Sequence, residues 1–298
     1  MFDIIALHAL FGSSIPISKF LLRFVPPIFL TGIRMLLAGL LLVGFNLLRK
    51  KNLMGMPRQV WWQYLQIIVV GVYLKYILRT WGLAYMPAVK MAFLLNIAPF
   101  VSAYFSYLAF KETLTRKQWL GISVGILGSV PILITSSAAE LKWGELFYIS
   151  WPELAIIVGV MAHCYGLIIS RTLVREHEHP ASLTNGVRML GGGILALITA
   201  FFVEPFHISD PEQFWGWLAI LIVVSNIICH NLYLRLLKRY TVTFISFTDF
   251  LSPLFIALYS WAFLHEAITW HYFASGAIVL IGLYLFYVDE LKVTPHAA

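Results

Sequence analysis

The segment Gly32-Ile33-Arg34-Met35-Leu36 has a near-copy 154 residues later, Gly186-Val187-Arg188-Met189-Leu190, and this repeat is the strongest indication of the fold. Two strongly apolar copies of one unit are typical of membrane transporters that bind their substrate where the copies meet. The register holds over most of the chain without a gap, so the sequence indicates an internal duplication. Identical residues that the shift aligns include Pro26 with Pro180, Phe93 with Phe247, Pro99 with Pro253, Glu112 with Glu266 and Gly128 with Gly282.

The composition is that of a chain whose surface faces mainly lipid. Hydrophobic residues make up 60% of the chain and charged residues 12%, and the mean hydropathy is +0.83, whereas a soluble domain has roughly a quarter charged residues. The net charge of +7 fits the basic cytoplasmic loops of membrane proteins, so no nucleic-acid partner is expected. Cys164 and Cys229 lie in apolar segments without metal-ligand spacing, and neither a metal nor a cofactor is expected.

Apolar segments long enough to cross a bilayer recur along the whole chain. A hydrocarbon core about 30 Å thick needs about 20 apolar residues per helix, and helices satisfy the backbone polar groups within each segment. We therefore predict an all-α membrane protein with ten transmembrane helices. The predicted spans are 3–22, 28–48, 63–84, 87–110, 115–135, 152–173, 181–203, 214–237, 241–264 and 268–288.

The distribution of basic residues predicts the orientation. Arg and Lys gather in the connections within 49–58, 111–117 and 238–239, whereas the connection 204–212 has neither. The positive-inside rule then places both termini in the cytoplasm and the chain in the cytoplasmic (inner) membrane.

The repeat and the orientation together predict how the two copies are related. Each copy holds five spans, an odd number, so the second copy enters the membrane in the opposite sense. We predict a 5+5 inverted repeat, with one five-helix unit at 1–138, a second at 150–290 and a cytoplasmic tail at 291–298.

Several motifs resemble the EamA-type members of the drug/metabolite transporter superfamily. The run Leu83-Ala84-Tyr85-Met86-Pro87-Ala88 is similar to a junction of that family, and the second half keeps Pro253, Glu266 and Gly282 but has Tyr272 and Ser275 where the pattern has Gln and Gly. The most complete part of the pattern is in the first half, at Pro99, Glu112, Gln118, Gly121 and Gly128.

The resemblance covers nearly the whole chain. It implies a secondary transporter of small metabolites, often amino acids, with a central cavity and with neither ATPase nor covalent chemistry. It also implies that spans 1, 3, 4, 6, 8 and 9 line the cavity and that spans 5 and 10 are peripheral.

Charged residues deep within spans are expensive in lipid and are candidates for function. Lys75 lies about 18 Å along its helix from Gln63, near the membrane midplane, and Arg79 follows one turn later with Tyr76 beside it. We expect these groups to hold an anionic group of the substrate; a structural pair neutralised by Asp249 is the alternative. Asp249 is then a proton carrier or an ion-pair partner of Lys75 that opens when substrate binds.

Other polar residues complete the predicted site, although interhelical hydrogen bonds explain each of them equally well. Arg34 and Arg188, equivalent by the repeat, are interpreted as packing or hinge residues rather than as substrate contacts, and Lys90 is expected to extend its ammonium to the membrane surface. The further candidates for substrate binding are Ser13, Trp81, Asn96, His163, Tyr165, Asn226, His230 and Asn231.

We expect a secondary active transporter that moves a small polar metabolite with an anionic group, an amino acid or a related compound, by alternating access. Coupling to a proton or a counter-substrate fits this mechanism. An importer or exchanger of nucleotide-type or S-adenosylmethionine-type metabolites is the alternative, because basic cavity residues suit these substrates as well. Outside transport, the alternatives are a lipid scramblase and an intramembrane enzyme, but the sequence shows no nucleophile–base or metal constellation that an enzyme needs.

Overall fold

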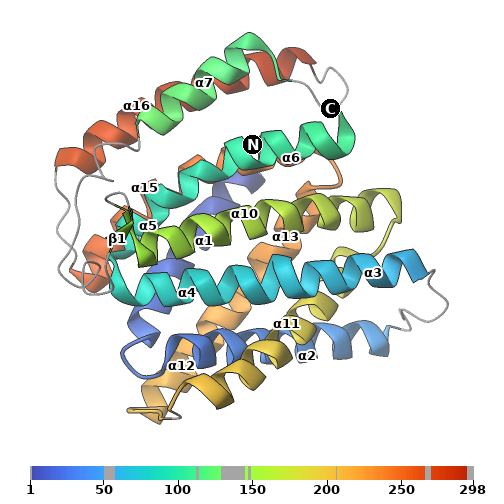
Figure 1. Ribbon diagram of the computed structural model, residues 1–298, viewed down its shortest axis with the longest axis vertical. Coiled ribbons are helices and arrows are strands. Elements are labelled where there is room, and N and C mark those ends of the chain that lie inside the picture. The colour runs from blue at the N-terminus through green and yellow to red at the C-terminus, as the bar shows by residue number, and fades with distance from the viewer. Residues whose placement is uncertain are drawn as a thin grey trace.

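The computed structural model describes residues 2–49, 58–111, 114–128, 145–146, 149–205, 207–265 and 270–293, which are nearly all helical (Figure 1). The helices up to residue 128 are α1 (Phe2–Leu21), α2 (Pro27–Leu48), α3 (Arg58–Gln66), η1 (Ile67–Leu74), α4 (Lys75–Tyr85), α5 (Ala88–Leu94), η2 (Leu95–Ile97), α6 (Ala98–Phe110) and α7 (Arg116–Leu127).

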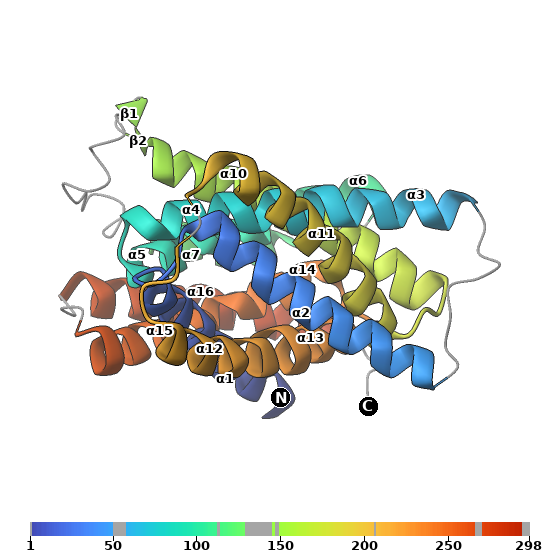
Figure 2. The same cartoon turned by 90° about the horizontal axis from the view of Figure 1, so that it is seen from below.

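The second part of the chain begins with a short antiparallel hairpin, which lies at one end of the molecule beside the start of the next helix (Figure 2). The elements are β1 (Glu145–Leu146), β2 (Ile149–Ser150), α10 (Trp151–Arg171), η3 (Thr172–Glu176), α11 (Ala181–Val203), α12 (Pro211–Leu221), η4 (Ile222–Cys229), α13 (His230–Leu236), α14 (Val242–Thr248), η5 (Asp249–Leu251), α15 (Ser252–Tyr259), η6 (Ser260–Leu264) and α16 (Trp270–Val293).

The prediction of an all-α membrane protein is confirmed at the level of class. Seven helices of the described residues are long and apolar enough to cross a membrane, and Ser252–Leu264 and Gly276–Phe286 are shorter apolar helices. The count of ten spans and the division into five-helix units stay predictions. The predicted span 115–135 is described only as far as Gly128, and Glu112 and Glu266 of the family pattern lie outside the described residues.

The helices α2 and α11 pack in antiparallel directions at very close range. A Cβ atom on Gly39 would overlap the backbone of Leu190, and a Cβ atom on Gly193 would overlap the backbone of Leu36. Gly39 and Gly193 are equivalent by the shift of 154 residues, and so are Leu36 and Leu190, so the two contacts are equivalent. Glycine is needed at these two positions because only a hydrogen atom fits between the backbones. Antiparallel packing of equivalent helices supports the predicted inversion.

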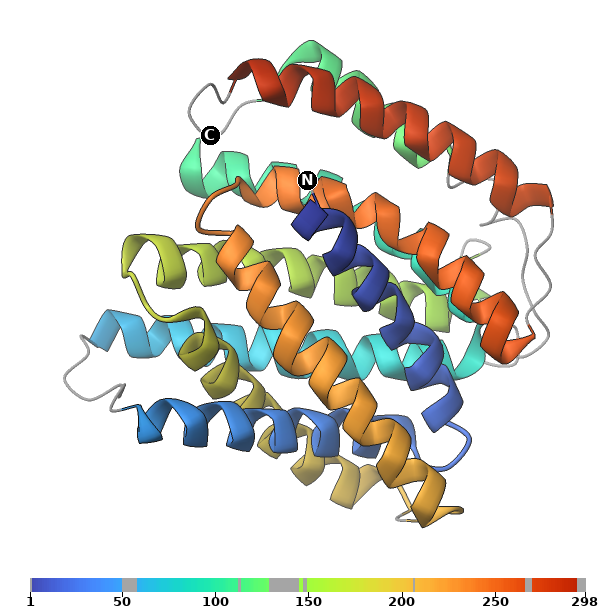
Figure 3. The ribbon, with the colours of Figure 1, turned by 180° about the vertical axis from the view of Figure 1, so that it is seen from behind.

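The helices α7 and α16 lie side by side at one edge of the bundle (Figure 1, Figure 3). A Cβ atom on Gly121 would lie 2.7 Å from the carbonyl oxygen of Gly282, and one on Gly282 would lie 2.6 Å from that of Gly121. This peripheral pair matches the place expected for the fifth and tenth spans.

Breaks in helical geometry recur at equivalent places in the two parts of the chain. The π-helical segments η1 and η4 precede Lys75 and His230, and π-helical turns are frequent at functional sites. The 3-10 turns η2 and η5 begin at Leu95 and Asp249, which are 154 residues apart, and a proline follows each in the first turn of the next helix. These breaks place backbone irregularities beside the same interior space.

Candidate functional site

Between the helices lies a cavity with about 1210 Å³ of empty space, its mouth included. Residues of spans 1, 3, 4, 6, 8 and 9 line it, as the family resemblance implies, and spans 2 and 7 each add an arginine. The charged groups of the lining are four cations and one carboxylate, namely Arg34, Lys75, Arg79, Arg188 and Asp249.

The cations cluster around the ring of Tyr76. The Nζ atom of Lys75 lies 4.4 Å from the ring centroid and the guanidinium carbon of Arg34 lies 5.1 Å from it, within the range of cation–π attraction. Lys75 and Arg79 share one helical face because they are four residues apart in α4. In the described part of the chain no carboxylate lies within 4.0 Å of these cations, and the Nε atoms of Arg34 and Arg79 are buried without a hydrogen-bond partner.

Neighbouring side chains hold the two arginines from spans 2 and 7. Arg34 donates from Nη1 to the hydroxyl of Ser18 at 3.1 Å, and Arg188 donates from Nη1 to the hydroxyl of Ser170 at 3.3 Å. Arg188 also donates from Nη2 to Asn185 Oδ1 at 3.0 Å. All these contacts are with neutral groups, so the positive charges are not neutralised by them.

A hydrogen bond between Tyr76 and His230 crosses the cavity region. The hydroxyl of Tyr76 contacts Nε2 of His230, while Nδ1 of His230 lies 2.6 Å from the carbonyl oxygen of Ser225. A carbonyl only accepts hydrogen bonds, so Nδ1 carries the proton and Nε2 of the neutral ring accepts from Tyr76. The ring of Phe11 packs edge-on against His230 with centroids 4.9 Å apart.

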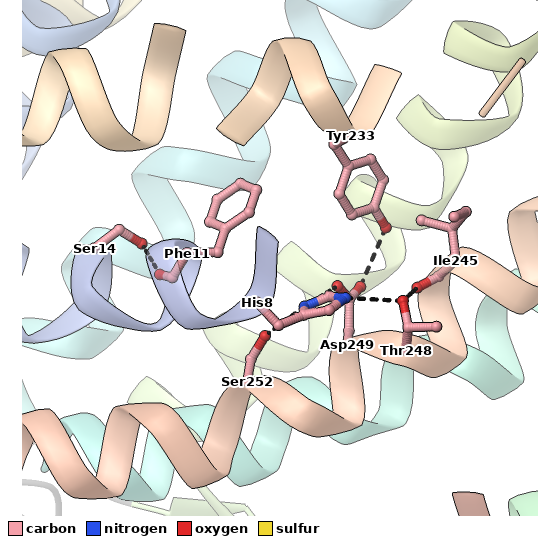
Figure 4. A network of polar contacts seen from close by, with 8 residues as sticks. All are labelled: His8, Phe11, Ser14, Tyr233, Ile245, Thr248, Asp249 and Ser252. Carbon is pink, nitrogen blue, oxygen red and sulfur yellow. Dashed lines mark hydrogen bonds and ion pairs between the residues drawn. The ribbon is translucent and has the colours of Figure 1, made fainter. Parts of the chain in front are cut away.

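Asp249 belongs to a second polar network at the 3-10 turn of the ninth span (Figure 4). Tyr233 donates its hydroxyl to Asp249 Oδ2 at 3.2 Å, and Nδ1 of His8 lies 3.6 Å from Oδ1. The side chain of His8 is fully buried, whereas that of Asp249 is 24% exposed. The carboxylate is therefore reachable from the cavity and the imidazole is not.

The tautomer of neutral His8 follows from its neighbours. Thr248 donates its hydroxyl to the carbonyl oxygen of Ile245 at 2.7 Å, so its oxygen accepts from His8 Nε2 at 2.8 Å. Nδ1 of neutral His8 is then an acceptor, facing the Ser252 hydroxyl at 3.0 Å. Asp249 Oδ1 consequently receives no hydrogen bond from neutral His8.

Of the predicted site residues, six line the cavity: Lys75, Tyr76, Arg79, His163, His230 and Asp249. The lining does not include the other six. Tyr165 packs edge-on against Phe105, and Asn226 donates to the sulfur of Met35 at 3.1 Å. The residues outside the lining are Ser13, Trp81, Asn96, Tyr165, Asn226 and Asn231.

The interpretation of Arg34 and Arg188 as packing or hinge residues stays a prediction, and both side chains line the cavity. Two other interpretations of buried charge were wrong. Lys75 and Asp249 do not form an ion pair, because the carboxylate lies beside His8 instead. Lys90 does not reach the membrane surface: it is 1% exposed and its Nζ lies 2.9 Å from Glu153 Oε1.

His8 and Tyr233 belong to the site but were not among the predicted residues. Both lie in apolar spans, where a titratable or hydroxyl side chain is a usable signal. Nothing in the spacing of either residue shows that it contacts Asp249, because the contacts join α1 and α13 to η5, which are separate elements of the chain.

Outside the spans, a carboxylate caps the start of α2. Glu204 accepts hydrogen bonds from the backbone N–H groups of Ile28 at 2.9 Å and Phe29 at 2.8 Å, which satisfies two donors at the helix start. Burial raises the pKa of the Glu204 carboxyl, against the opposing effect of these two donors. The contact ties the connection after α11 to the start of α2.

Comparison with known proteins shows the class of this chain. A family model described as the EamA-like transporter family matches residues 2–134 and again residues 150–288. The chain is 31% identical over 289 residues to a protein of Chlamydia muridarum (strain MoPn / Nigg) named S-adenosylmethionine/S-adenosylhomocysteine transporter, covering 95% of this chain and 90% of that protein. A protein of the same name from Chlamydia trachomatis serovar L2 is 30% identical, covering 95% and 87%.

A solved crystal structure shares the fold, with a TM-score of 0.77 over 97% of both chains at 17% identity. The apolar helices and these relatives define a multi-pass membrane transporter rather than an enzyme. The chain belongs to the EamA-like transporter family.

Proposed function

We propose that this protein exchanges S-adenosylmethionine and S-adenosylhomocysteine across the cytoplasmic membrane by alternating access. The observation that carries the proposal is the cavity, which combines four cations, one carboxylate and several aromatic rings. The two relatives that are about 30% identical over 95% of the chain, both named for these substrates, favour this pair over other small metabolites.

The cation cluster suits the carboxylate that both substrates carry. Arg34 Nε and Arg79 Nε are buried donors that no protein group satisfies in the described part of the chain, and a buried unsatisfied donor is costly. A substrate carboxylate that accepts from them removes that cost and gains charge-assisted hydrogen bonds. Lys75 adds a point charge on the same helical face.

Aromatic side chains of the lining suit the adenine ring. Phe11, Tyr76 and Tyr233 all line the cavity, and aromatic pairs stack favourably with ring centroids about 4.5–7 Å apart. In this proposal adenine lies against these rings while the amino-acid end reaches the charged groups.

A small anionic metabolite such as an acidic amino acid is the second candidate. The described lining carries four cations and one carboxylate, and this net positive charge favours an anionic substrate. Such a substrate makes no use of the aromatic rings, so competition experiments separate the two candidates.

Uptake into proteoliposomes tests the proposal. Purified protein is reconstituted, and entry of labelled S-adenosylmethionine is measured against unlabelled S-adenosylhomocysteine, adenosine, methionine, glutamate and aspartate. We expect saturable uptake that S-adenosylhomocysteine inhibits fully and the acidic amino acids do not. Saturable uptake of glutamate or aspartate, with none of S-adenosylmethionine, contradicts the proposal and supports the second candidate.

A further inference from the structure

The two proposed substrates differ at their sulfur atom. The sulfur of S-adenosylmethionine carries a methyl group and a permanent positive charge, whereas that of S-adenosylhomocysteine is a neutral thioether. With the same carboxylate and ammonium on both, the first has a net charge one unit more positive. A protein that exchanges them needs a group whose interaction depends on that charge.

We propose that Asp249 is this specificity-determining residue, and that its carboxylate is the counter-charge for the sulfonium of S-adenosylmethionine. The inference rests on the proposed function. In the described lining Asp249 is the one carboxylate, against four cations. An uncharged or zwitterionic ligand is compatible with such a cavity, but an additional positive charge is repelled unless an acid lies beside it.

The contacts of Asp249 leave it available to a ligand. Oδ2 accepts from Tyr233 at 3.2 Å, and His8 Nδ1, which lies 3.6 Å from Oδ1, is an acceptor in the neutral ring. Carboxylate oxygens accept about four hydrogen bonds in total, so most of this capacity is unused. The side chain is 24% exposed, and it belongs to the lining of the cavity.

His8 is a positioning residue in this arrangement. Thr248 and Ser252 hold its two ring nitrogens at 2.8 and 3.0 Å, and the ring is fully buried. The fixed ring limits where the Asp249 carboxylate can move, since Oδ1 lies beside it. His8 therefore acts on selectivity through Asp249 and makes no contact with substrate.

The experiment compares the two substrates on matched carboxylate variants. Initial uptake and competition constants for both substrates are measured with wild type, Asp249→Asn, Asp249→Glu and the control Asp210→Asn. Asp210 caps α12 outside the cavity, accepting from Gln213 at 3.2 Å, and Asn is an equally good cap. We expect Asp249→Asn to lower the preference for S-adenosylmethionine over S-adenosylhomocysteine by about tenfold or more, Asp249→Glu to retain most of it, and Asp210→Asn to leave it unchanged.

If the Asp249 carboxylate is only structural, Asp249→Asn lowers transport of both substrates by the same factor and leaves the ratio of the two rates unchanged. That result overturns the inference. Should Asp249→Asn not fold, Asp249→Ser is measured in its place, and an unchanged ratio there overturns the inference likewise. A wild-type protein that transports neither substrate contradicts the proposed function itself, so the two failures are distinguishable. As a check on wild type, an analogue with a protonated amine in place of the methylsulfonium is expected to compete as S-adenosylmethionine does.

Discussion

Tyr76 and His230 are 154 residues apart, the period of the internal repeat, and they are hydrogen-bonded to each other. Equivalent residues can meet in this way only where the axis that relates the two copies passes between them. Met35 and Met189, also 154 residues apart, both have their sulfur atoms near the side-chain nitrogen of Asn226, at 3.1 and 3.7 Å. The charged cavity lies around this contact, as expected for a transporter whose site is shared by both copies.

The Tyr76–His230 contact is expected to couple the two copies energetically. Tyr76→Phe and His230→Gln should each destabilise the protein by about 1 kcal/mol, the net value of one hydrogen bond. Because each single change removes the same bond, the double variant should lose less than the sum. Thermal unfolding of the four proteins in detergent measures the coupling, and additive losses contradict the assignment.

Lys75 is predicted to bind the substrate carboxylate. Lys75→Gln should weaken binding of either substrate by about tenfold or more, because it removes an unneutralised charge from the cavity. Lys238, which is exposed, provides the control Lys238→Gln. Binding isotherms of the purified proteins check the prediction, and equal affinities of Lys75→Gln and wild type refute it.

Gly39 is predicted to tolerate no side chain. Gly39→Ala inserts a methyl group into the backbone of Leu190, so α2 and α11 must separate. We expect a loss of stability of about 1–3 kcal/mol, typical of overpacking. Gly44 lies in the same helix, and a Cβ atom there would have no other atom within 4 Å, so Gly44→Ala should be neutral or slightly stabilising. Unfolding temperatures that rank these two variants in the opposite order are incompatible with the close contact.

The buried ion pair between Lys90 and Glu153 is predicted to be structural. Lys90→Met leaves the Glu153 carboxylate buried without its cation and should cost about 3–5 kcal/mol. Adding Glu153→Gln should restore part of this, because the amide oxygen still accepts from the backbone of Ser150, as the carboxylate does at 2.6 Å. Stability measurements on the single and double variants decide the matter; a double variant less stable than Lys90→Met argues against the pair.

A pH effect is predicted at His179, in the connection before α11. Burial lowers the pKa of His179 from its ordinary value of 6.5, and the nearby His177 acts in the same direction. The folded protein thus binds this proton less readily than the unfolded chain does, so the contribution of His179 to stability is present above pH 6.5 and decreases as the pH falls below it.

The measurement is the difference in unfolding temperature between wild type and His179→Asn at about pH 7.5 and about pH 5.5, on either side of the ordinary histidine pKa. We expect wild type to lose more stability than the variant on acidification, because burial and the nearby His177 oppose protonation of the His179 ring in the folded protein. An identical loss in both proteins shows that His179 does not contribute.

Much of the architecture was predictable from local patterns. Long apolar segments predicted membrane helices, and the register of 154 residues predicted which helices are equivalent, as the reciprocal contact of Gly39 and Gly193 illustrates. The 3-10 turns η2 and η5, which precede Pro99 and Pro253, were not predicted. The π-helical segments η1 and η4 were not predicted, since their apolar sequences carry no signal that distinguishes them from α-helix.

The site was predictable where charge alone marked it. Lys75, Arg79 and Asp249 stand out because ionisable groups are rare within spans. Arg34 and Arg188 are also ionisable groups within spans. Their equivalence by the repeat favoured the interpretation as packing residues, but both side chains line the cavity.

Asn226 and Tyr165, predicted to bind substrate, are absent from the cavity lining. The side of a helix that faces a cavity depends on tertiary packing, and a uniformly apolar span does not reveal that side.

Counterflow measures most directly whether the cavity exchanges S-adenosylmethionine for S-adenosylhomocysteine. Proteoliposomes are loaded with unlabelled S-adenosylhomocysteine and diluted into labelled S-adenosylmethionine. The controls are wild-type vesicles without internal substrate and loaded vesicles that contain the Lys75→Gln variant. We expect a transient accumulation of label above equilibrium in loaded wild-type vesicles, and little in the other two. Equal label in loaded and empty wild-type vesicles, at the level of protein-free liposomes, contradicts it.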